Sequence, residues 1–238
     1  MLERLDYMKL APRRILDAGS GPPQRVLGKR YPQAEVVALD FSLRMLRSAR
    51  SWREIFRKRL SICGDLERLP LAGETVDLIW CNMALHWLAE PLAALKEFER
   101  VLAPQGLLML SSLGPDTLKE LRAAAGAGRV HAFHDMHDVG DMLVAAGFSA
   151  PVMDMEMLTI AYPGADGLLT DLRASGQTSA RADRPRGLTG KGFAARLRAT
   201  LAASATFELV YGHAWKRAAR PQNAGETAKT VRVFKRMP

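Results

Sequence analysis

The stretch Arg14-Ile15-Leu16-Asp17-Ala18-Gly19-Ser20-Gly21 joins a short apolar run to a turn that contains two glycines. An apolar run of this length predicts a buried β-strand, and a helix is expected to follow the turn and reach about Lys29. Glycine lets the backbone approach a ligand because it has no Cβ. The stretch therefore predicts the first strand, turn and helix of an α/β domain, with a ligand crevice at the carboxyl end of the strand.

Four more strand signals follow before residue 112, and helical segments separate them. The expected strands lie at residues 35–40, 60–63, 75–80 and 106–111. Helices are expected after Ser42, a candidate N-cap, and over residues 91–102. Strands that alternate with helices are typical of a parallel sheet covered on both faces. The sequence thus predicts an α/β fold with a doubly wound, mostly parallel, Rossmann-like sheet.

The second half of the chain has a different texture and is expected to add helices and strands to this sheet. The expected helices lie at residues 137–146, 164–174 and 191–203, and the expected strands at residues 150–160 and 206–211. We predict one domain over residues 1–218, in which residues 1–112 bind a cofactor and residues 113–218 face the substrate. Residues 219–238 are expected to form a basic tail.

The composition is that of a globular protein, because 48% of the 238 residues are apolar and 25% are charged. No run approaches the roughly 18 apolar residues of a membrane span, and Glu3, Arg4 and Asp6 interrupt the N-terminus where a secretory signal would be apolar. A cytoplasmic location is therefore expected. Cys63 and Cys81 make neither a disulfide framework nor a metal-binding spacing, so no metal is expected.

The net charge of +9 is concentrated in two segments. Seven basic residues and one Glu lie between Arg44 and Arg59, and seven more lie between Lys216 and Arg236 beside Glu226. Such segments are either solvated surface or a site for an acidic partner. Nucleic acid, an anionic membrane and an acidic carrier protein all remain open on charge alone.

Polar side chains stand at the ends of three further predicted strands. Asp40 ends the second strand, 19 residues after Gly21, where a carboxylate accepts hydrogen bonds from a ribose diol. Asp65 follows the third strand, where it could accept from an adenine amine, and Asn82 ends the fourth. A dinucleotide fold needs a third glycine soon after Gly21, but prolines occupy residues 22–23. The pattern therefore predicts a nucleoside ligand without a phosphate cradle.

This pattern of an Asp-x-Gly-x-Gly turn followed by polar strand ends resembles the class I S-adenosylmethionine-dependent methyltransferases. The resemblance implies that S-adenosylmethionine is the cofactor. It also implies a set of cofactor-binding residues at the carboxyl ends of the strands: Asp17, Gly19, Gly21, Asp40, Phe41, Asp65, Leu66 and Asn82.

Five further segments resemble the malonyl-acyl-carrier-protein O-methyltransferase family of biotin synthesis. They lie at residues 64–71, 82–87, 113–121, 135–140 and 211–215, and the likeness covers roughly residues 10 to 217. It implies methylation of the free carboxylate of a malonyl thioester on acyl carrier protein. The expected partner is therefore this acidic carrier protein, and neither nucleic acid nor a membrane is expected to take part. We expect the carrier to dock at Arg44–Arg59 or at the Arg-rich loop 181–191.

A carboxylate is ionised at neutral pH, so its methylation needs alignment and exclusion of water rather than a general base. The catalytic candidates are His86 and Trp87, which we expect to floor the pocket, and Arg173, which we expect to hold the carboxylate. Trp87 could equally be a core residue. Arg186 is the second candidate for the carboxylate.

Five other residues are placed by pattern. His131 is expected in a loop near the active site rather than in a metal site. His213 and Trp215 lie on the last strand, where they either reach the pocket or pack in the core. Asp116 or Thr117 is expected to be the N-cap of a following helix.

Two departures from the family pattern favour alternative readings. Relatives usually begin with a further segment that closes the pocket, and Pro23 stands where the superfamily commonly has glycine, so weaker closure and weaker cofactor binding are expected. One alternative is a non-catalytic or weakly active methyltransferase-like protein that acts through protein interaction. Another is a protein-modifying relative of the respiratory complex I assembly-factor family. A nucleic-acid methyltransferase is disfavoured because Asn82-Met83-Ala84-Leu85 replaces the expected Pro-Pro-aromatic run.

Overall fold

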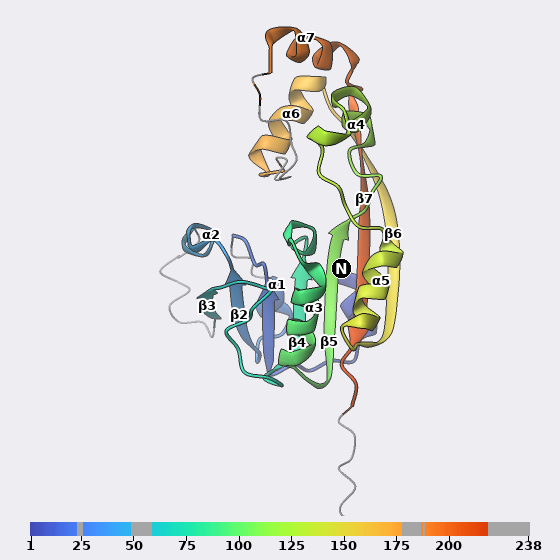
Figure 1. Cartoon of the computed structure of the whole chain (residues 1–238). Coiled ribbons are helices and arrows are strands. Elements are labelled where there is room, and N and C mark those ends of the chain that lie inside the picture. Colours follow the sequence, from blue (N-terminus) through green and yellow to red (C-terminus); the bar gives the residue numbers. More distant parts are fainter. Residues whose placement is uncertain (23–25, 49–58, 178–186, 188, 219–238) are drawn as a thin grey trace, which may run out of the picture.

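One sheet organises the computed structural model, which describes residues 1–22, 26–48, 59–177, 187 and 189–218 (Figure 1). Its order is β3-β2-β1-β4-β5-β7-β6. The strands are β1 (Arg14–Ala18), β2 (Glu35–Asp40), β3 (Arg59–Cys63), β4 (Val76–Asn82), β5 (Leu102–Leu113), β6 (Ser149–Ala161) and β7 (Ser204–Trp215). Strands β1 to β5 pair in parallel, and β7 runs antiparallel to both β5 and β6. The predicted doubly wound, mostly parallel sheet is confirmed.

The strand order reverses between β1 and β4. The chain builds outward from β1 to β3 and then returns to place β4 on the other side of β1. Ala18 pairs with Leu39 and Asp17 pairs with Trp80, so the carboxyl ends of β1, β2 and β4 lie side by side. In open α/β sheets a ligand crevice forms outside the carboxyl ends of the strands at such a reversal.

Successive side chains of the strands point to opposite faces of the sheet and belong to two hydrophobic clusters, one on each face. Leu16 and Ile79 face the cluster that includes α3 (Pro91–Val101) and α5 (Met136–Ala145). Ile15 and Leu78 face the other, which includes residues of α1 (Val26–Arg30) and the 3-10 helix η1 (Glu3–Tyr7), with Leu5 fully buried. Because both faces of the sheet are covered, these strands are continuous apolar runs in the sequence, and that is the pattern from which they were predicted.

A third cluster lies beyond the carboxyl edge of the parallel strands. It joins α4 (Lys119–Ala125), α6 (Ala165–Ala174) and α7 (Lys191–Thr200) to the neighbouring ends of β6 and β7, as Figure 1 shows above the sheet. Its buried residues are Leu118, Val130, Leu168, Leu172, Leu201 and Ala205. We call these three helices the α4–α6–α7 group. They close over the edge where the predicted site residues lie.

Several local predictions are confirmed and one is wrong. Ser42 caps α2 (Leu43–Arg47) by accepting a hydrogen bond from the backbone N–H of Met45 at 3.3 Å. Neither Asp116 nor Thr117 caps α4. Leu118 precedes that helix, and the Thr117 hydroxyl instead donates to the Glu208 carbonyl and accepts from the Glu208 N–H. The hydroxyl is used to bind strand β7, which leaves none for a cap.

The outer strands are longer than the sequence predicted. β5 and β7 pair along residues 107–113 and 209–215, and β7 pairs with β6 over almost its whole length. A helix was expected after Thr117, and the structure gives its bounds as those of α4. Residues 219–238, the predicted tail, lie outside the described residues. Of the helices in the described part of the chain, none combines the length and apolarity that crossing a bilayer requires.

Candidate active site

A cavity of about 240 Å³ opens at the carboxyl ends of β1 and β4, next to the glycine turn. We call it the strand-end cavity. Its walls come from β1, the turn, α1, β4 and the first residues of the chain: Met1, Leu2, Asp17, Gly19, Ser20, Val26, Leu27, Trp80 and Asn82. Three of the predicted cofactor residues, Asp17, Gly19 and Asn82, therefore line one cavity.

The N-terminal residues reach this cavity because η1 is anchored on the sheet. Leu5 is fully buried in the cluster beneath α1. Arg4 forms an ion pair with Asp154 of β6, and its guanidinium lies 4.7 Å from the centroid of the Tyr211 ring of β7. These contacts hold Met1 and its neighbour over the strand ends.

Asp40 fixes the shape of the glycine turn. Its carboxylate accepts hydrogen bonds from the backbone N–H of Gly21 at 2.8 Å and of Ser42 at 2.7 Å. A carboxylate has about four lone-pair positions, so these two bonds leave acceptor capacity for a diol. The side chain thus joins the ends of β1 and β2 to the start of α2 and lies against the predicted cofactor turn.

The two glycines of the turn serve different purposes. Gly19 has φ +68°, and a Cβ placed on it would lie 2.4 Å from the Cβ of Ala84, so the turn packs directly on the segment after β4. Gly21 has φ +56°, and a Cβ there would meet nothing within 4 Å. Gly19 is therefore required for packing, whereas the space beside Gly21 is open to a ligand.

The polar strand ends form a row that suits an elongated nucleoside. Asn82, Asp17, Asp40 and Asp65 stand at or just beyond β4, β1, β2 and β3, which are neighbours in that order. With about 4.8 Å between adjacent strands, the row spans about 14 Å. Ser111 orients Asn82 by donating to its Oδ1 at 2.8 Å. A row of hydrogen-bond acceptors fits an uncharged ribose and a cationic group better than a phosphate.

Phe41, Asp65 and Leu66 lie at the same edge but outside the lining of the strand-end cavity. The Phe41 ring is 82% exposed beside Asp40, and Asp65 is exposed and accepts from the N–H of Glu67 at 2.9 Å. Leu66 is buried, with its Cδ1 3.7 Å from the position of a Cβ on Gly19. Pro23 lies outside the described residues.

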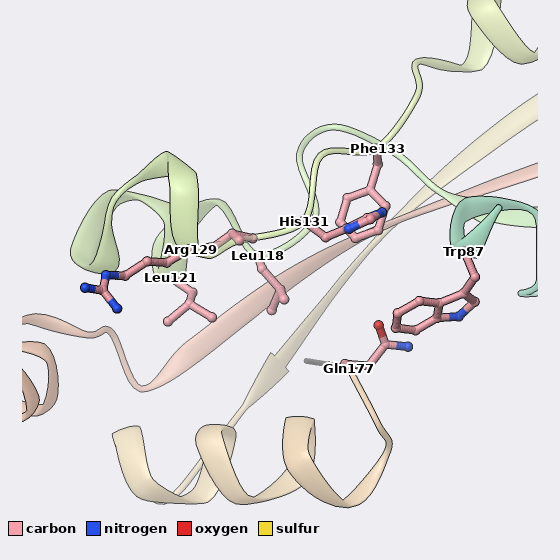
Figure 2. Close-up of a pocket in the computed structure, with 8 residues that line it drawn as sticks. Trp87, Leu118, Leu121, Arg129, His131, Phe133 and Gln177 are labelled. Atoms are coloured by element: carbon pink, nitrogen blue, oxygen red, sulfur yellow. The ribbon is translucent and has the colours of Figure 1, made fainter. Parts of the chain in front are cut away.

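A second pocket lies under the α4–α6–α7 group, and Figure 2 shows its walls. We call it the Trp87 pocket. It gathers residues of the 3-10 helix η3 (Leu85–Trp87), of α4 and of the segments after α4 and α6: Trp87, Leu118, Leu121, Arg129, Val130, His131, Phe133 and Gln177. Its volume of about 30 Å³ has room for little more than a water molecule.

Two histidines and two aromatic rings pack together behind this wall. The ring centroid of His86 lies 5.3 Å from that of Trp87 and 5.6 Å from that of Phe133, and His131 lies 5.1 Å from Phe133. The Nε2–H of His131 donates to the His86 carbonyl oxygen at 3.0 Å, because a carbonyl can only accept. His131 is thus in the predicted loop and in contact with the predicted pocket floor.

His86 itself is 5% exposed, and both of its ring nitrogens are without a hydrogen-bond partner among the described residues. Burial, and secondarily the nearby His131, lower the pKa of His86 to about 4. The imidazole is therefore neutral at neutral pH. It packs against Trp87 and Phe133 and is not the imidazolium acid at neutral pH.

The buried His86 should make the fold sensitive to mild acid. The unfolded chain binds a proton near pH 6.5, whereas the folded chain does so only near pH 4, so stability falls as pH drops through that window. Between pH 7 and pH 4 the wild type should lose about 3 kcal/mol more unfolding free energy than His86→Phe, at about 1.4 kcal/mol per pKa unit. Urea unfolding at both pH values measures this difference. His134→Phe, at an exposed histidine of the neighbouring loop, is the matched control, and equal losses in wild type and His86→Phe would contradict the prediction.

The structure separates the arginine candidates. Arg173 is exposed in the last turn of α6, four residues before Gln177, and its side chain makes no ion pair or hydrogen bond with any described residue. Arg129 lines the Trp87 pocket, but its guanidinium is engaged with Phe193 and Thr189 on the side of α7. Arg186 lies outside the described residues. Of the two arginine candidates that the structure describes, Arg173 is therefore the one whose guanidinium has no described partner.

His213 and Trp215 line neither cavity. Trp215 packs against the cluster around Leu5, and His213 is half-buried on β7, where burial and the nearby Arg4 lower its pKa. Trp215 thus packs against the core, as one of the two stated alternatives has it, whereas His213 is in none of the hydrophobic clusters of the described residues.

Sequence reasoning missed the walls of the Trp87 pocket on the substrate side. Leu118, Arg129 and Gln177 come from separate segments and meet only through the tertiary fold. Of these lining residues, Phe133 could have been predicted from the sequence. An aromatic side chain between two histidines in a polar loop is expected to pack against other side chains rather than to face solvent.

Comparisons with known proteins show the family and the fold of the chain. Residues 16–110 match the model of a methyltransferase domain. The protein named malonyl-[acyl-carrier protein] O-methyltransferase of Gallionella capsiferriformans is 47% identical over 94% of this chain and 84% of that protein. The protein of the same name from Laribacter hongkongensis is 44% identical over 98% and 86%. In fold, a putative methyltransferase of Bacillus halodurans matches 91% of this chain and 97% of its own, with a TM-score of 0.65 at 20% identity.

The resemblance drawn from the five sequence segments is confirmed by these relatives, which cover nearly all of the described strands and helices. The chain belongs to the malonyl-[acyl-carrier protein] O-methyltransferase family.

Proposed function

We propose that this protein transfers a methyl group from S-adenosylmethionine to the free carboxylate of a malonyl thioester on acyl carrier protein, at an early step of biotin synthesis. The observation that carries the proposal is that residues 82–87 border both cavities. Asn82 lines the strand-end cavity, and Trp87 lines the second pocket five residues later. A ligand at the strand ends and a substrate beneath the α4–α6–α7 group would therefore be neighbours. The names of the relatives supply the substrate.

The residues at the strand ends fit the cofactor. When bound, S-adenosylmethionine supplies a methyl group carried on a positively charged sulfur. We assign the ribose diol to Asp40 and the adenine end to Asp65, Phe41 and Leu66, because they follow β2 and β3. Asp17 and Asn82, together with the open space at Gly21, line the path toward the substrate side. Carboxylates along this row also favour a cation over an anion.

The chemical role of the other residues is to position the substrate and to exclude water. A malonate carboxylate is ionised at neutral pH, so no side chain has to remove a proton. His86, neutral and buried, holds Trp87 and His131 in place, and these close the wall of the pocket. Replacing water by fixed protein groups raises the reactivity of an anion whose hydration shell would otherwise shield it.

Arg173 is assigned to the substrate carboxylate, since its guanidinium has no partner among the described residues and the residue lies four positions before Gln177 of the pocket wall. Charge-assisted hydrogen bonds contribute about 1.5–3 kcal/mol, so Arg173→Ala should raise KM for the carrier-bound substrate about 10- to 100-fold. Arg173→Lys should recover part of the loss, because it keeps the charge without the planar fork. Steady-state kinetics with Arg47→Ala, an exposed arginine of α2, as control test this; an unchanged KM for Arg173→Ala would remove the assignment.

The function is tested directly by incubating the purified protein with S-adenosylmethionine and malonyl acyl carrier protein, and following the methyl ester by mass spectrometry. Acetyl acyl carrier protein, which has no free carboxylate, is the matched negative substrate. Ester formation on the malonyl carrier alone is expected. Binding of S-adenosylmethionine without any ester would overturn the proposal.

The alternative functions are not favoured. The relatives that cover most of the chain are named as O-methyltransferases, which gives no support to a purely interacting protein or to an arginine-modifying assembly factor. The proposal includes the cytoplasm as the location and acyl carrier protein as the partner, without nucleic acid or membrane. It also assigns residues 1–112 to the cofactor and residues 113–218 to the substrate.

A further inference from the structure

Helix α7 presents a basic surface that no described acid neutralises fully. The helix carries Lys191, Arg196 and Arg198 and contains no Asp or Glu. Arg198 pairs with Asp166 of α6 at 2.7 Å. Lys191 and Arg196 are exposed, and within the described ranges neither has an acidic partner. Two positive charges therefore project from this helix into solvent.

The acids that lie nearest in the α4–α6–α7 group are already engaged. Glu120 of α4 accepts from the hydroxyl and the N–H of Thr206, and these bonds outweigh burial to lower its pKa. Asp171 of α6 accepts from the Tyr162 hydroxyl at 2.9 Å. Both carboxylates are thus hydrogen-bonded to other groups, and neither pairs with Lys191 or Arg196, so the charge of α7 stays positive.

The same helix contacts Arg129, one of the residues that line the Trp87 pocket. The Arg129 guanidinium lies 4.2 Å from the centroid of the Phe193 ring of α7 and donates to the Thr189 hydroxyl at 3.3 Å. Figure 2 shows Arg129 at one end of the pocket and Trp87 at the other, with Leu118 and Leu121 between them. A narrow apolar wall thus runs from α7 toward the residues that adjoin the strand-end cavity.

A second basic surface, on α2, is less well placed. Arg44 and Arg47 are exposed there, but α2 follows β2, and β1 separates that strand from β4. The rest of the two segments expected to dock the carrier, residues 49–58 and most of 181–191, lies outside the described residues. Of the described basic surfaces, only α7 adjoins a wall of the substrate pocket.

We infer that the exposed face of α7, centred on Lys191 and Arg196, is the docking surface for the acidic carrier protein. The thioester arm then enters from the α7 side and runs past Arg129 and Leu121 to Trp87. The inference rests on the proposed function and adds to it the site and direction of approach. Complementary charge at such a surface speeds encounter and makes association sensitive to salt.

The test compares Lys191→Glu/Arg196→Glu with the matched double variant Arg44→Glu/Arg47→Glu on α2. Each protein is assayed on malonyl acyl carrier protein and on malonyl pantetheine, which has the arm without the carrier. The α7 variant should lose at least about tenfold in kcat/KM on the carrier-bound substrate and keep its activity on malonyl pantetheine. The α2 variant should match the wild type on both, and only the wild type and the α2 variant should lose activity as salt rises.

Fluorescence anisotropy of labelled malonyl acyl carrier protein gives a readout that does not depend on turnover, and the α7 variant should bind it at least about tenfold more weakly. Equal binding by wild type and α7 variant would overturn the docking surface while leaving the proposed function intact. An equal loss on both substrates, or a loss in the α2 variant alone, would also overturn it. Absence of turnover in the wild type would overturn the proposed function, and binding would then decide the docking surface by itself.

Discussion

Gly19→Ala is expected to weaken S-adenosylmethionine binding about 100-fold or more and to reduce methyl transfer accordingly. The added Cβ would lie 2.4 Å from the Ala84 Cβ, and Ala84 is 8% exposed and held between β4 and η3. The left-handed backbone at φ +68° costs about 1–2 kcal/mol for a residue with a Cβ, and overpacking typically adds about 1–3 kcal/mol. Relief of the clash must displace either the cofactor turn or the segment that leads to Trp87.

Calorimetric titration with S-adenosylmethionine measures the loss. Gly28→Ala is the matched control, since a Cβ on this residue of α1 would meet nothing within 4 Å and alanine favours a helix by about 1 kcal/mol. The control should bind as the wild type does and melt at the same or a higher temperature. Wild-type affinity in Gly19→Ala would mean that the turn does not contact the ligand.

Asp40→Ala should reduce S-adenosylmethionine affinity by about 100- to 10,000-fold, the second large effect. The substitution removes the acceptor for the N–H groups of Gly21 and Ser42 and, on our assignment, for the ribose diol. Hydrogen bonds to a charged acceptor contribute about 1.5–3 kcal/mol each, which gives this range when two are lost. Asp40→Asn keeps one acceptor oxygen, so its affinity for S-adenosylmethionine should lie between those of Asp40→Ala and the wild type.

Asp77→Ala is the matched control for Asp40, because Asp77 also accepts from two backbone N–H groups, those of Arg13 and Arg14, but at the opposite end of β1. It should lose stability and keep cofactor affinity. An analogue of S-adenosylmethionine without the ribose hydroxyls completes a double-mutant cycle. If Asp40→Ala still prefers the hydroxylated cofactor as strongly as the wild type does, Asp40 does not hold the diol.

The cofactor half of the molecule was predictable because its signals are local. Leu16 and Ile15 point to opposite faces of one strand, and the same alternation recurs in the parallel strands beside it. Parallel strands bring their carboxyl ends to one edge, so Asp40 and Asn82 could be placed together without knowing the packing of any helix.

The substrate half was less predictable because its contacts are between distant segments. Leu118 and Gln177 meet at the Trp87 pocket only after β5, β7 and β6 have paired. The hydrophobic periodicity of neither segment predicts that the two residues will be in contact. Thr117 has the residue type of a helix cap, yet it binds Glu208 of β7, 91 residues away. The hydrogen bonds of Thr117 to a distant strand thus replace the helix-capping role that its position in the sequence suggested.

The place of β7 in the sheet has a consequence for biosynthesis. This strand is the last of the described strands to leave the ribosome, yet it occupies an interior position between β5 and β6. Until residues 204–215 emerge, β6 has no partner among the described strands, and two of its own side chains, Met155 and Met157, are exposed even in the folded chain. A nascent chain stalled before that point therefore exposes an unpaired, aggregation-prone strand, the kind of surface that chaperones bind.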